Sequence, residues 1–342
     1  MRRFFSEHID IGGRTVGEKS PCLVVAEAGV AHFGDLGKAL RLVDMAAKAG
    51  AEMIKFQLFD VDALIAVSCH EWRERLGGRR LTPEQMMKVR DHCCTRNIQF
   101  LATAHDLPSL EALDSLEVPA YKVGSGELAN WDFIRKVAER GKPVILSTGM
   151  YSEGDVKNAL EVFRDVGNPD VVLLHCVTQY PTPPEDVNLR AMDTLRERFG
   201  AITGYSDHTE GIHFPLAAVA RGARVVEKHI SLDFHVPNAQ DWKVSCDEAS
   251  LAALVTQVRR VEAGLGHGRK EPVEGELRNL AWARKSLVSR RGIPEGTSIT
   301  GDMLDAKRPG TGIPPNERGR VVGRTAAFHI EADTLITWEM IK

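Results

Sequence analysis

Short apolar segments alternate with amphipathic segments along most of this chain, from residue 22 to residue 264. Each apolar run is short, as expected of parallel strands that are covered on both faces. The predicted strands cover residues 22–28, 53–57, 99–102, 120–123, 143–147, 171–175, 202–205 and 225–229. The predicted helices cover residues 36–48, 83–96, 108–116, 131–139, 153–165, 189–199, 213–221 and 248–264. Eight alternating pairs predict an α/β fold of the (β/α)8 TIM-barrel type. A doubly wound open sheet is the alternative, but no G-x-G-x-x-G follows the first strand.

The domain organisation follows from changes in composition along the 342 residues. Residues 1–264 form the predicted barrel domain, with a β-hairpin within residues 1–20 that turns at Gly12 and Gly13. Residues 265–283 are the predicted linker, which begins with a Gly-rich, charged stretch. Residues 284–342 form a predicted small β-rich domain, with β-like segments at 286–290, 298–300 and 334–338. Candidate helix N-caps are Asp35, Thr82, Ser152 and Asn188.

The composition excludes several classes of protein. A net charge of −3 gives no indication of a nucleic-acid or membrane-surface binder. No apolar run reaches the roughly 20 residues that a membrane-spanning helix needs, and polar and acidic residues occur too early for a signal peptide. The six cysteines form no CxxC pair and suit reduced thiols. We therefore predict a cytoplasmic protein.

Polar residues follow the ends of all eight predicted strands, where a barrel of this type carries its active site. In strand order they are Glu27; Lys55 and Gln57; Thr103; Lys122, Ser125 and Glu127; Ser147 and Thr148; His175; Ser206 and His208; and Glu227 and His229. Two lysines, several hydroxyls and glycine-containing loops suit a phosphate group. Glu27 and Glu127 face these cations and are candidates for hydroxyl recognition or proton transfer.

His208 and His229 lie 21 positions apart (229 − 208), each at the end of a strand in one strand–helix–strand unit. Neighbouring strands are about 4.8 Å apart, so both imidazoles can reach one divalent ion. The alternative is a pair of polar strand ends with ordinary hydrogen bonds. Period-two alternation places Glu227 and His229 on one face of their strand, and Lys228 on the other, where packing against a helix is favoured over catalysis.

Several segments in order resemble the sialic acid synthase family, which includes N-acetylneuraminate, legionaminate and pseudaminate synthases. These segments are residues 26–32 (AEAGVAH), 55–57 (KFQ), 121–127 (YKVGSGE), 146–150 (LSTGM), 175–189 (HCVTQYPTPPEDVNL), 204–209 (GYSDHT) and 227–233 (EKHISLD). The C-terminal part, especially residues 307–312 (KRPGTG), resembles the antifreeze-like (SAF) domain of that family. The resemblance covers nearly the whole chain.

The resemblance implies metal-dependent condensation of phosphoenolpyruvate with an N-acylated amino-aldose similar to N-acetylmannosamine. The products would be a nine-carbon 3-deoxy-ulosonic acid and free phosphate, released by C–O cleavage. It also implies that His208 and His229 bind the metal, Mn²⁺ in the first place and Mg²⁺ or Co²⁺ as alternatives.

The resemblance also assigns roles to other residues. The implied phosphoenolpyruvate ligands are Lys55, Thr103, Lys122, Ser125, Thr178 and Ser206. The implied catalytic residues are Glu27, Glu127, Tyr180 and Glu227, and the implied sugar ligands are Gln57, Asp241 and Arg308. Arg308 would reach the barrel of a second subunit, which implies a domain-swapped homodimer.

The chain departs from the family pattern in loops that are expected to face the sugar. Ala31 replaces a common Asn, the segment 103–106 reads TAHD where the family has TPFD, and residues 237–243 differ from the usual PGPDHK. We therefore expect the family reaction with an altered aldose. The alternatives are a phosphorylated aldose, as in a 3-deoxy-arabino-heptulosonate-type synthase, and a non-catalytic barrel that binds through its small domain.

Overall fold

We describe the chain from a computed structural model, in which residues 4–237, 239 and 241–342 are described. Asn238 and Gln240 of the divergent 237–243 segment lie outside these residues. The chain divides into two compact units, one ending at Gly266 and the other spanning His267–Lys342. The expected linker, residues 265–283, covers the end of the first unit and the start of the second.

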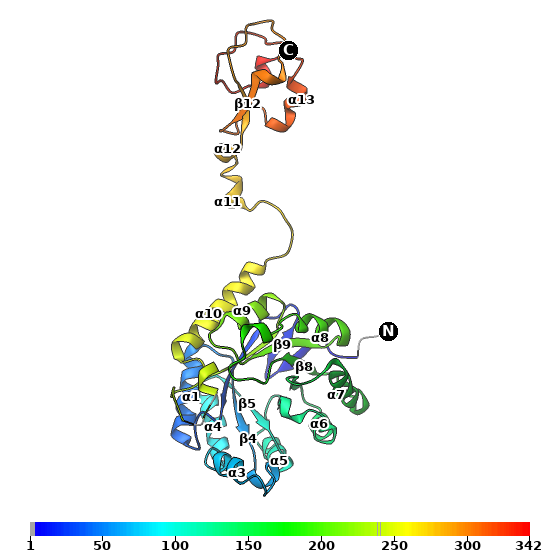
Figure 1. Ribbon diagram of the computed structural model, residues 1–342, viewed down its shortest axis with the longest axis vertical. Helices are drawn as coiled ribbons and strands as arrows, with labels where there is room; N and C mark the ends of the chain where they lie inside the picture. Colours follow the sequence, from blue (N-terminus) through cyan, green and yellow to red (C-terminus); the bar gives the residue numbers. More distant parts are fainter. Residues whose placement is uncertain (1–3, 238, 240) are drawn as a thin grey trace. The chain divides into compact units, whose positions relative to one another are not determined.

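The first unit is a closed barrel of parallel strands, and Figure 1 shows helices surrounding it. Its hydrogen-bonded order is β10-β3-β4-β5-β6-β7-β8-β9. The strands are β3 (Leu23–Gly29), β4 (Met53–Leu58), β5 (Gln99–Ala104), β6 (Tyr121–Val123), β7 (Val144–Ser147), β8 (Val171–His175), β9 (Ile202–Asp207) and β10 (Val225–His229). The helices that follow them are α1 (Leu36–Ala49), α4 (Pro83–Thr95), α5 (Leu107–Ser115), α6 (Trp131–Ala138), α7 (Glu153–Val166), α8 (Ala191–Phe199), α9 (His213–Ala220) and α10 (Glu248–Leu265). The predicted (β/α)8 barrel is confirmed.

Each barrel strand buries both faces, so its two sets of alternating side chains belong to different layers. Val25, Met53 and Leu174 belong to the cluster inside the barrel, whereas Val24 and Val226 belong to the larger cluster between strands and helices. The hairpin of β1 (His8–Ile11) and β2 (Arg14–Gly17) contributes to the inner cluster. This alternation decides which polar strand-end residues enter the barrel.

The N-terminal caps of the helices agree with the sequence in three of the four predicted places. The side chains of Asp35, Thr82 and Ser152 accept backbone N–H groups at the starts of α1, α4 and α7. Asn188 is not a cap, because α8 begins only at Ala191. The Asn188 backbone is left-handed (φ 45°) and its carbonyl accepts the Ala191 N–H, so this residue forms a turn before the helix.

Two short helices after β4 were not predicted, α2 (Val61–Leu64) and α3 (His70–Gly77). Neither contains a buried residue, so no apolar periodicity marks them in the sequence.

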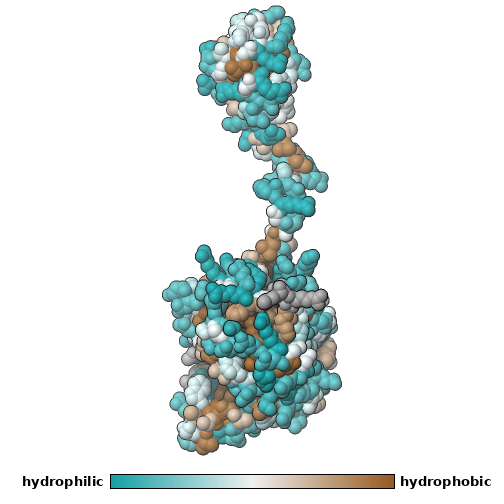
Figure 2. All heavy atoms as spheres, turned by 90° about the vertical axis from the view of Figure 1, so that its right-hand side faces the viewer, coloured by the Kyte–Doolittle hydropathy of each residue, from teal (hydrophilic) through white to brown (hydrophobic). Residues whose placement is uncertain are grey.

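The second unit is small and has its own hydrophobic core, which includes Leu287, Ile299, Leu304 and Ile336. β11 (Ser286–Ser289) and β12 (Leu304–Lys307) pair antiparallel. The expected β-like segments at 298–300 and 334–338 take part only in isolated bridges. Its short helices are α11 (Glu274–Leu277), α12 (Leu280–Ala283) and α13 (Arg318–Val321). In Figure 2 hydrophilic side chains cover most of the visible surface of each unit, with separate hydrophobic patches. No helix in the described part of the chain is long and apolar enough to cross a membrane.

Candidate active site

The polar ring expected from the sequence lies at the carboxyl ends of the barrel strands. Its side chains occupy the alternating positions that face the inside of the barrel. Most of these inward polar groups follow an inward hydrophobic residue two positions earlier, as Glu27 follows Val25 and Lys55 follows Met53. The buried polar residues that point inward are Glu27, Lys55, Thr103, Lys122, Ser147, Ser206, Glu227 and His229, and Gln57 joins them half-buried. Hydrophobic packing fills the barrel below, which leaves the polar chemistry at one end.

Two lysines and two carboxylates form one connected cluster at the centre of the ring. Lys55 Nζ lies 2.7 Å from Glu27 Oε2 and 3.7 Å from Glu227 Oε2. Lys122 Nζ lies 3.8 Å from Glu227 Oε2. Lys55 therefore lies within 4 Å of two buried carboxylates, whereas Lys122 lies within 4 Å of one.

Neutral donors and acceptors surround these charges. Lys55 donates to Thr103 Oγ1 (3.2 Å), and Lys122 donates to Ser147 Oγ (2.7 Å). Ser206 Oγ donates to Glu227 (3.0 Å), and Gln57 donates to Glu27 (2.9 Å). The cluster thus offers cations and hydroxyl groups to an anion that enters the ring.

Burial and charge together shift the pKa values of this cluster. Burial raises the pKa of Glu27 and is only partly opposed by Lys55. Burial alone would also raise the pKa of Glu227, but Lys122 and Lys55 lower it overall. Burial alone would lower the pKa of Lys55, but the two carboxylates raise it, whereas the pKa of Lys122 stays lowered by burial.

Ser125, Gly149 and Thr178 meet at the neighbouring part of the ring. The backbone N–H of Gly149 donates to Ser125 Oγ (2.9 Å), and Ser125 Oγ lies 3.3 Å from Cys176 Sγ. A Cβ added to Gly149 would lie 2.3 Å from Thr178 Oγ1 and 2.8 Å from Ser125 Oγ. Only glycine allows this close approach of the hydroxyl groups.

The two histidines are adjacent at the ends of β9 and β10, with ring centroids 5.4 Å apart. Burial lowers the pKa of His208 to about 4 and also lowers the pKa of His229, which favours neutral imidazoles. His208 Nδ1 lies 2.6 Å from the Val177 carbonyl, and Tyr180 Oη lies 2.9 Å from His208 Nε2. Donation from Nδ1 to the carbonyl leaves Nε2 without a proton, so its lone pair accepts the Tyr180 hydroxyl and could instead bind a metal.

This donor set fits a divalent metal with open coordination positions. Two neutral imidazoles side by side, one oriented by a carbonyl, are ordinary metal ligands. Among the described residues, no group of three or more His, Cys, Asp or Glu side chains suits a metal. An ion held by these two imidazoles would keep coordination positions open to water or substrate.

The remaining predicted residues lie in loops or in the second unit. Glu127 ends the 3-10 turn Ser125–Glu127, accepts from Asn130 (2.7 Å) and has a pKa that burial raises. Asp241 begins the turn Asp241–Val244, and its charge acts on both His229 and Tyr180. Arg308 belongs to the second unit, where its Nε donates to the Ala283 carbonyl (3.0 Å) and its guanidinium lies 5.3 Å from the Trp282 ring centroid.

The assignment of His175 to the ring was wrong. Leu174 occupies the inward phase of β8, so His175 points outward; its Nε2 lies 2.8 Å from the Val187 carbonyl and its ring packs on Tyr205. The next inward residue, Cys176, contacts Ser125 instead. Strict period-two counting from Val172 would have identified Cys176.

His105 was read only as a departure from the family pattern. Its imidazole is half-buried next to Lys55 and Lys122, and desolvation lowers its pKa to about 4. It also lines a cavity of about 520 Å³ together with Glu127 and Asn130. The sequence signal for it was its position just beyond the end of a barrel strand.

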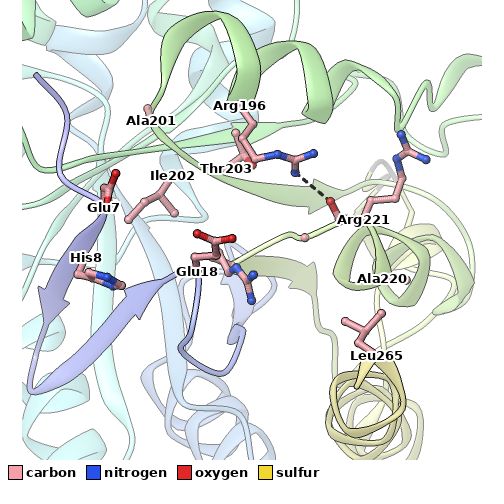
Figure 3. Close-up of a pocket in the computed structure, with 12 residues that line it drawn as sticks. Glu7, His8, Glu18, Arg196, Ala201, Ile202, Thr203, Ala220, Arg221 and Leu265 are labelled. Carbon is pink, nitrogen blue, oxygen red and sulfur yellow. Dashed lines mark hydrogen bonds between the residues drawn. The ribbon is translucent and has the colours of Figure 1, made fainter. Parts of the chain in front are cut away.

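A second cavity of about 520 Å³ lies at the opposite ends of β9 and β10 (Figure 3). Its lining includes Arg196 and Arg221, whose guanidinium groups both pair with Asp193. Arg196 also donates to the Arg221 carbonyl, the dashed line in Figure 3. These cations already have protein partners and lie away from the polar ring, so we assign this cavity no catalytic role.

A (β/α)8 barrel with buried lysines, carboxylates and paired histidines at its carboxyl end belongs to the class of barrel proteins whose polar site at that end suits an anionic ligand. Comparison with known proteins gives the family. The NeuB family model matches residues 42–270, and the SAF domain model matches residues 284–342. The chain belongs to the NeuB family of sialic acid-type synthases and carries a C-terminal SAF domain.

Relatives in this family differ in their named products. The chain is 37% identical to N,N'-diacetyllegionaminic acid synthase of Campylobacter jejuni, over 92% of this chain and 98% of that protein. It is 35% identical to human N-acetylneuraminate-9-phosphate synthase, over 96% and 95%. A crystal structure of N-acetylneuraminic acid synthetase from Leptospira borgpetersenii, in complex with citrate, superposes with a TM-score of 0.75 at 35% identity, covering 80% of this chain and 95% of that one.

Proposed function

We propose that this protein condenses phosphoenolpyruvate with an N-acylated amino-aldose, giving a nine-carbon sialic-acid-type acid and phosphate. The observation that carries this proposal is the buried cluster of Lys55, Lys122 and their hydroxyl neighbours beside His208 and His229. Lysines and hydroxyls suit the phosphate and carboxylate of phosphoenolpyruvate. Family membership supports the same reaction type.

The chemistry needs one carbon–carbon bond and one C–O cleavage. C3 of phosphoenolpyruvate attacks the aldehyde carbon, water adds at C2, and phosphate leaves with its bridging oxygen. In this proposal Lys55, Lys122, Thr103, Ser125, Thr178 and Ser206 hold phosphoenolpyruvate. The aldehyde oxygen gains a proton and the attacking water loses one, and Glu27, Glu127, Tyr180 and Glu227 are the candidates for these transfers.

The proposed metal is Mn²⁺, with Mg²⁺ or Co²⁺ as alternatives, and His208 and His229 would hold it. When bound, the ion would supply Lewis-acid polarisation of the aldehyde. Gln57 and Asp241 are the sugar ligands that we propose from the barrel unit. The loop that contains His105 and the 237–243 segment would then select the aldose, and because both depart from the family pattern we propose an altered sugar.

Phosphate release with Mn²⁺ across a panel of aldoses tests the function. The panel holds N-acetylmannosamine, its 6-phosphate and 2,4-diacetamido-trideoxyhexoses. We expect phosphate release that requires an aldose and stops with a chelator, with the diacetamido sugars preferred over N-acetylmannosamine. Efficient turnover of N-acetylmannosamine would contradict the altered sugar, and preference for the 6-phosphate would favour a phosphorylated acceptor. No release with any aldose would contradict the proposed reaction.

We also propose that Arg308 acts in the barrel of a second subunit of a domain-swapped homodimer. Within its own unit the guanidinium is held by Trp282 and the Ala283 carbonyl, which leaves a preorganised cation on an exposed loop. A mixture of His229→Ala and Arg308→Ala chains should regain activity, because one of the two sites in a mixed dimer would carry both wild-type residues. Each variant alone is the control. Activity that stays at the level of the separate variants after subunit exchange would contradict sharing.

A further inference from the structure

The region behind the two histidines contains a buried ion pair that the reaction does not use. Lys228 Nζ lies 2.5 Å from Asp207 Oδ2, and the two side chains are 1% and 0% exposed. They lie on neighbouring strands, directly paired in the β9–β10 register. Both occupy the outward phase, because Ser206 and Glu227 contact each other on the inward side. They are therefore separated from the inward site by the sheet itself.

Each member of this pair immediately precedes one histidine in the sequence. His208 follows Asp207, and His229 follows Lys228. Because the two preceding residues are paired in register, the position of one strand end relative to the other also sets the separation of the imidazoles.

Lys228 donates hydrogen bonds to the residues on both sides of His208. Besides the Asp207 carboxylate, its ammonium group donates to the Thr209 carbonyl (2.7 Å). The other oxygen of Asp207 accepts from Tyr205 Oη (2.9 Å) and from both the hydroxyl (2.9 Å) and the N–H (3.2 Å) of Thr209. Lys228 of β10 thus connects residues 207 and 209 at the end of β9 through hydrogen bonds.

We propose that Asp207 and Lys228 are positioning residues that fix the spacing of His208 and His229 for a shared metal ion. This inference rests on the proposed function for the identity of the metal, but its geometric part concerns the protein alone. A purely structural pair is the alternative, because buried ion pairs often contribute no more stability than apolar residues of the same size. The positioning role and the purely structural role predict different metal affinities when both charges are removed together. Only the positioning role predicts weaker Mn²⁺ binding in a protein that still folds.

The test variant is Asp207→Asn combined with Lys228→Met. This double variant leaves no unpaired buried charge, and the asparagine oxygen can still accept from Tyr205 and Thr209. We expect a folded protein whose Mn²⁺ affinity, measured by electron paramagnetic resonance, falls about tenfold or more, the usual range for residues that orient metal ligands. Phosphoenolpyruvate affinity should fall much less than Mn²⁺ affinity, since Lys55 and Lys122 lie on β4 and β6 and only Ser206 among the proposed ligands adjoins the pair.

A matched control is Arg259→Met on α10, which removes a partly buried ion pair with Glu52, away from the histidines. It should lower stability and leave Mn²⁺ affinity at the wild-type value. Should this double variant fail to fold, Asp207→Asn combined with Lys228→Gln also leaves no buried charge, retains one hydrogen bond toward residue 207 or Thr209, and should still weaken Mn²⁺ binding. Wild-type Mn²⁺ affinity in whichever folded variant is measured would overturn the proposal.

A second readout needs no metal. In metal-free protein with labelled histidines, the Nδ1–H of His208 bonded to Val177 should give a distinct nuclear magnetic resonance signal. The double variant should broaden or shift this signal and the Arg259→Met control should not. If wild-type protein binds no Mn²⁺, the proposed metal role fails, and the positioning role is then decided by this signal alone. A signal that is the same in the double variant and in wild-type protein would overturn the positioning role. If Mn²⁺ binds but no aldose reacts, the proposed reaction fails while the positioning role stands.

Discussion

Lys55→Met is expected to destabilise the protein strongly and to remove most of its affinity for phosphoenolpyruvate. Lys55 lies between Glu27 and Glu227, at 2.7 Å and 3.7 Å, and all three side chains are buried. Removal of one partner from a buried ion pair costs about 3–5 kcal/mol, because the remaining charge is left without compensation. Urea unfolding should show a loss of this size, and calorimetry should show phosphoenolpyruvate binding weakened by about 100-fold, in line with the cost of losing a buried charge contact.

The matched variant is Lys122→Met, which should weaken phosphoenolpyruvate binding with a smaller loss of stability. Lys122 has one carboxylate neighbour at 3.8 Å, and Lys55 remains close to that carboxylate. Lys157→Met on α7 is the surface control, because its partner Glu161 is exposed and such pairs contribute about 0.5 kcal/mol or less. A larger stability loss in Lys122→Met than in Lys55→Met would show that the charges are not distributed as we describe.

Gly149→Ala is expected to close the part of the site formed by Ser125 and Thr178. The added methyl group would lie 2.3 Å from Thr178 Oγ1, 2.8 Å from Ser125 Oγ and 3.1 Å from Cys176 Sγ. Two or more of these groups must move, and displacement of positioning groups by about 1 Å can cost about 100-fold in rate. We expect kcat/KM for phosphoenolpyruvate to fall by about that factor, with a smaller change in thermal stability.

The control for this substitution is Gly154→Ala on α7. An added Cβ there meets only Ser152 Oγ at 3.6 Å, an ordinary contact, and alanine favours the helix. Steady-state kinetics should be unchanged in Gly154→Ala. If Gly149→Ala also kept wild-type kinetics, Ser125 and Thr178 would not be the phosphoenolpyruvate ligands that we propose.

Most of the barrel and much of its polar ring could be predicted because local patterns carry that information. Short apolar strands and amphipathic helices have different periods, and β5 and β8 were each placed to within two residues. Helices α2 and α3 could not be found, since they bury no side chain. Asn188 shows the limit of capping signals, because a residue suited to a cap also suits a left-handed turn.

The sequence by itself determined the barrel, the family and the set of polar residues at the strand ends, because these depend on periodicity and on the order of motifs. Only the tertiary structure decided which groups become partners. Lys55 joins Glu27 to Glu227, and Lys228 joins Asp207 across two strand ends, whereas His175 turns away from the site. These contacts depend on the strand register around the closed barrel, which brings side chains distant in the chain to within 4 Å of one another.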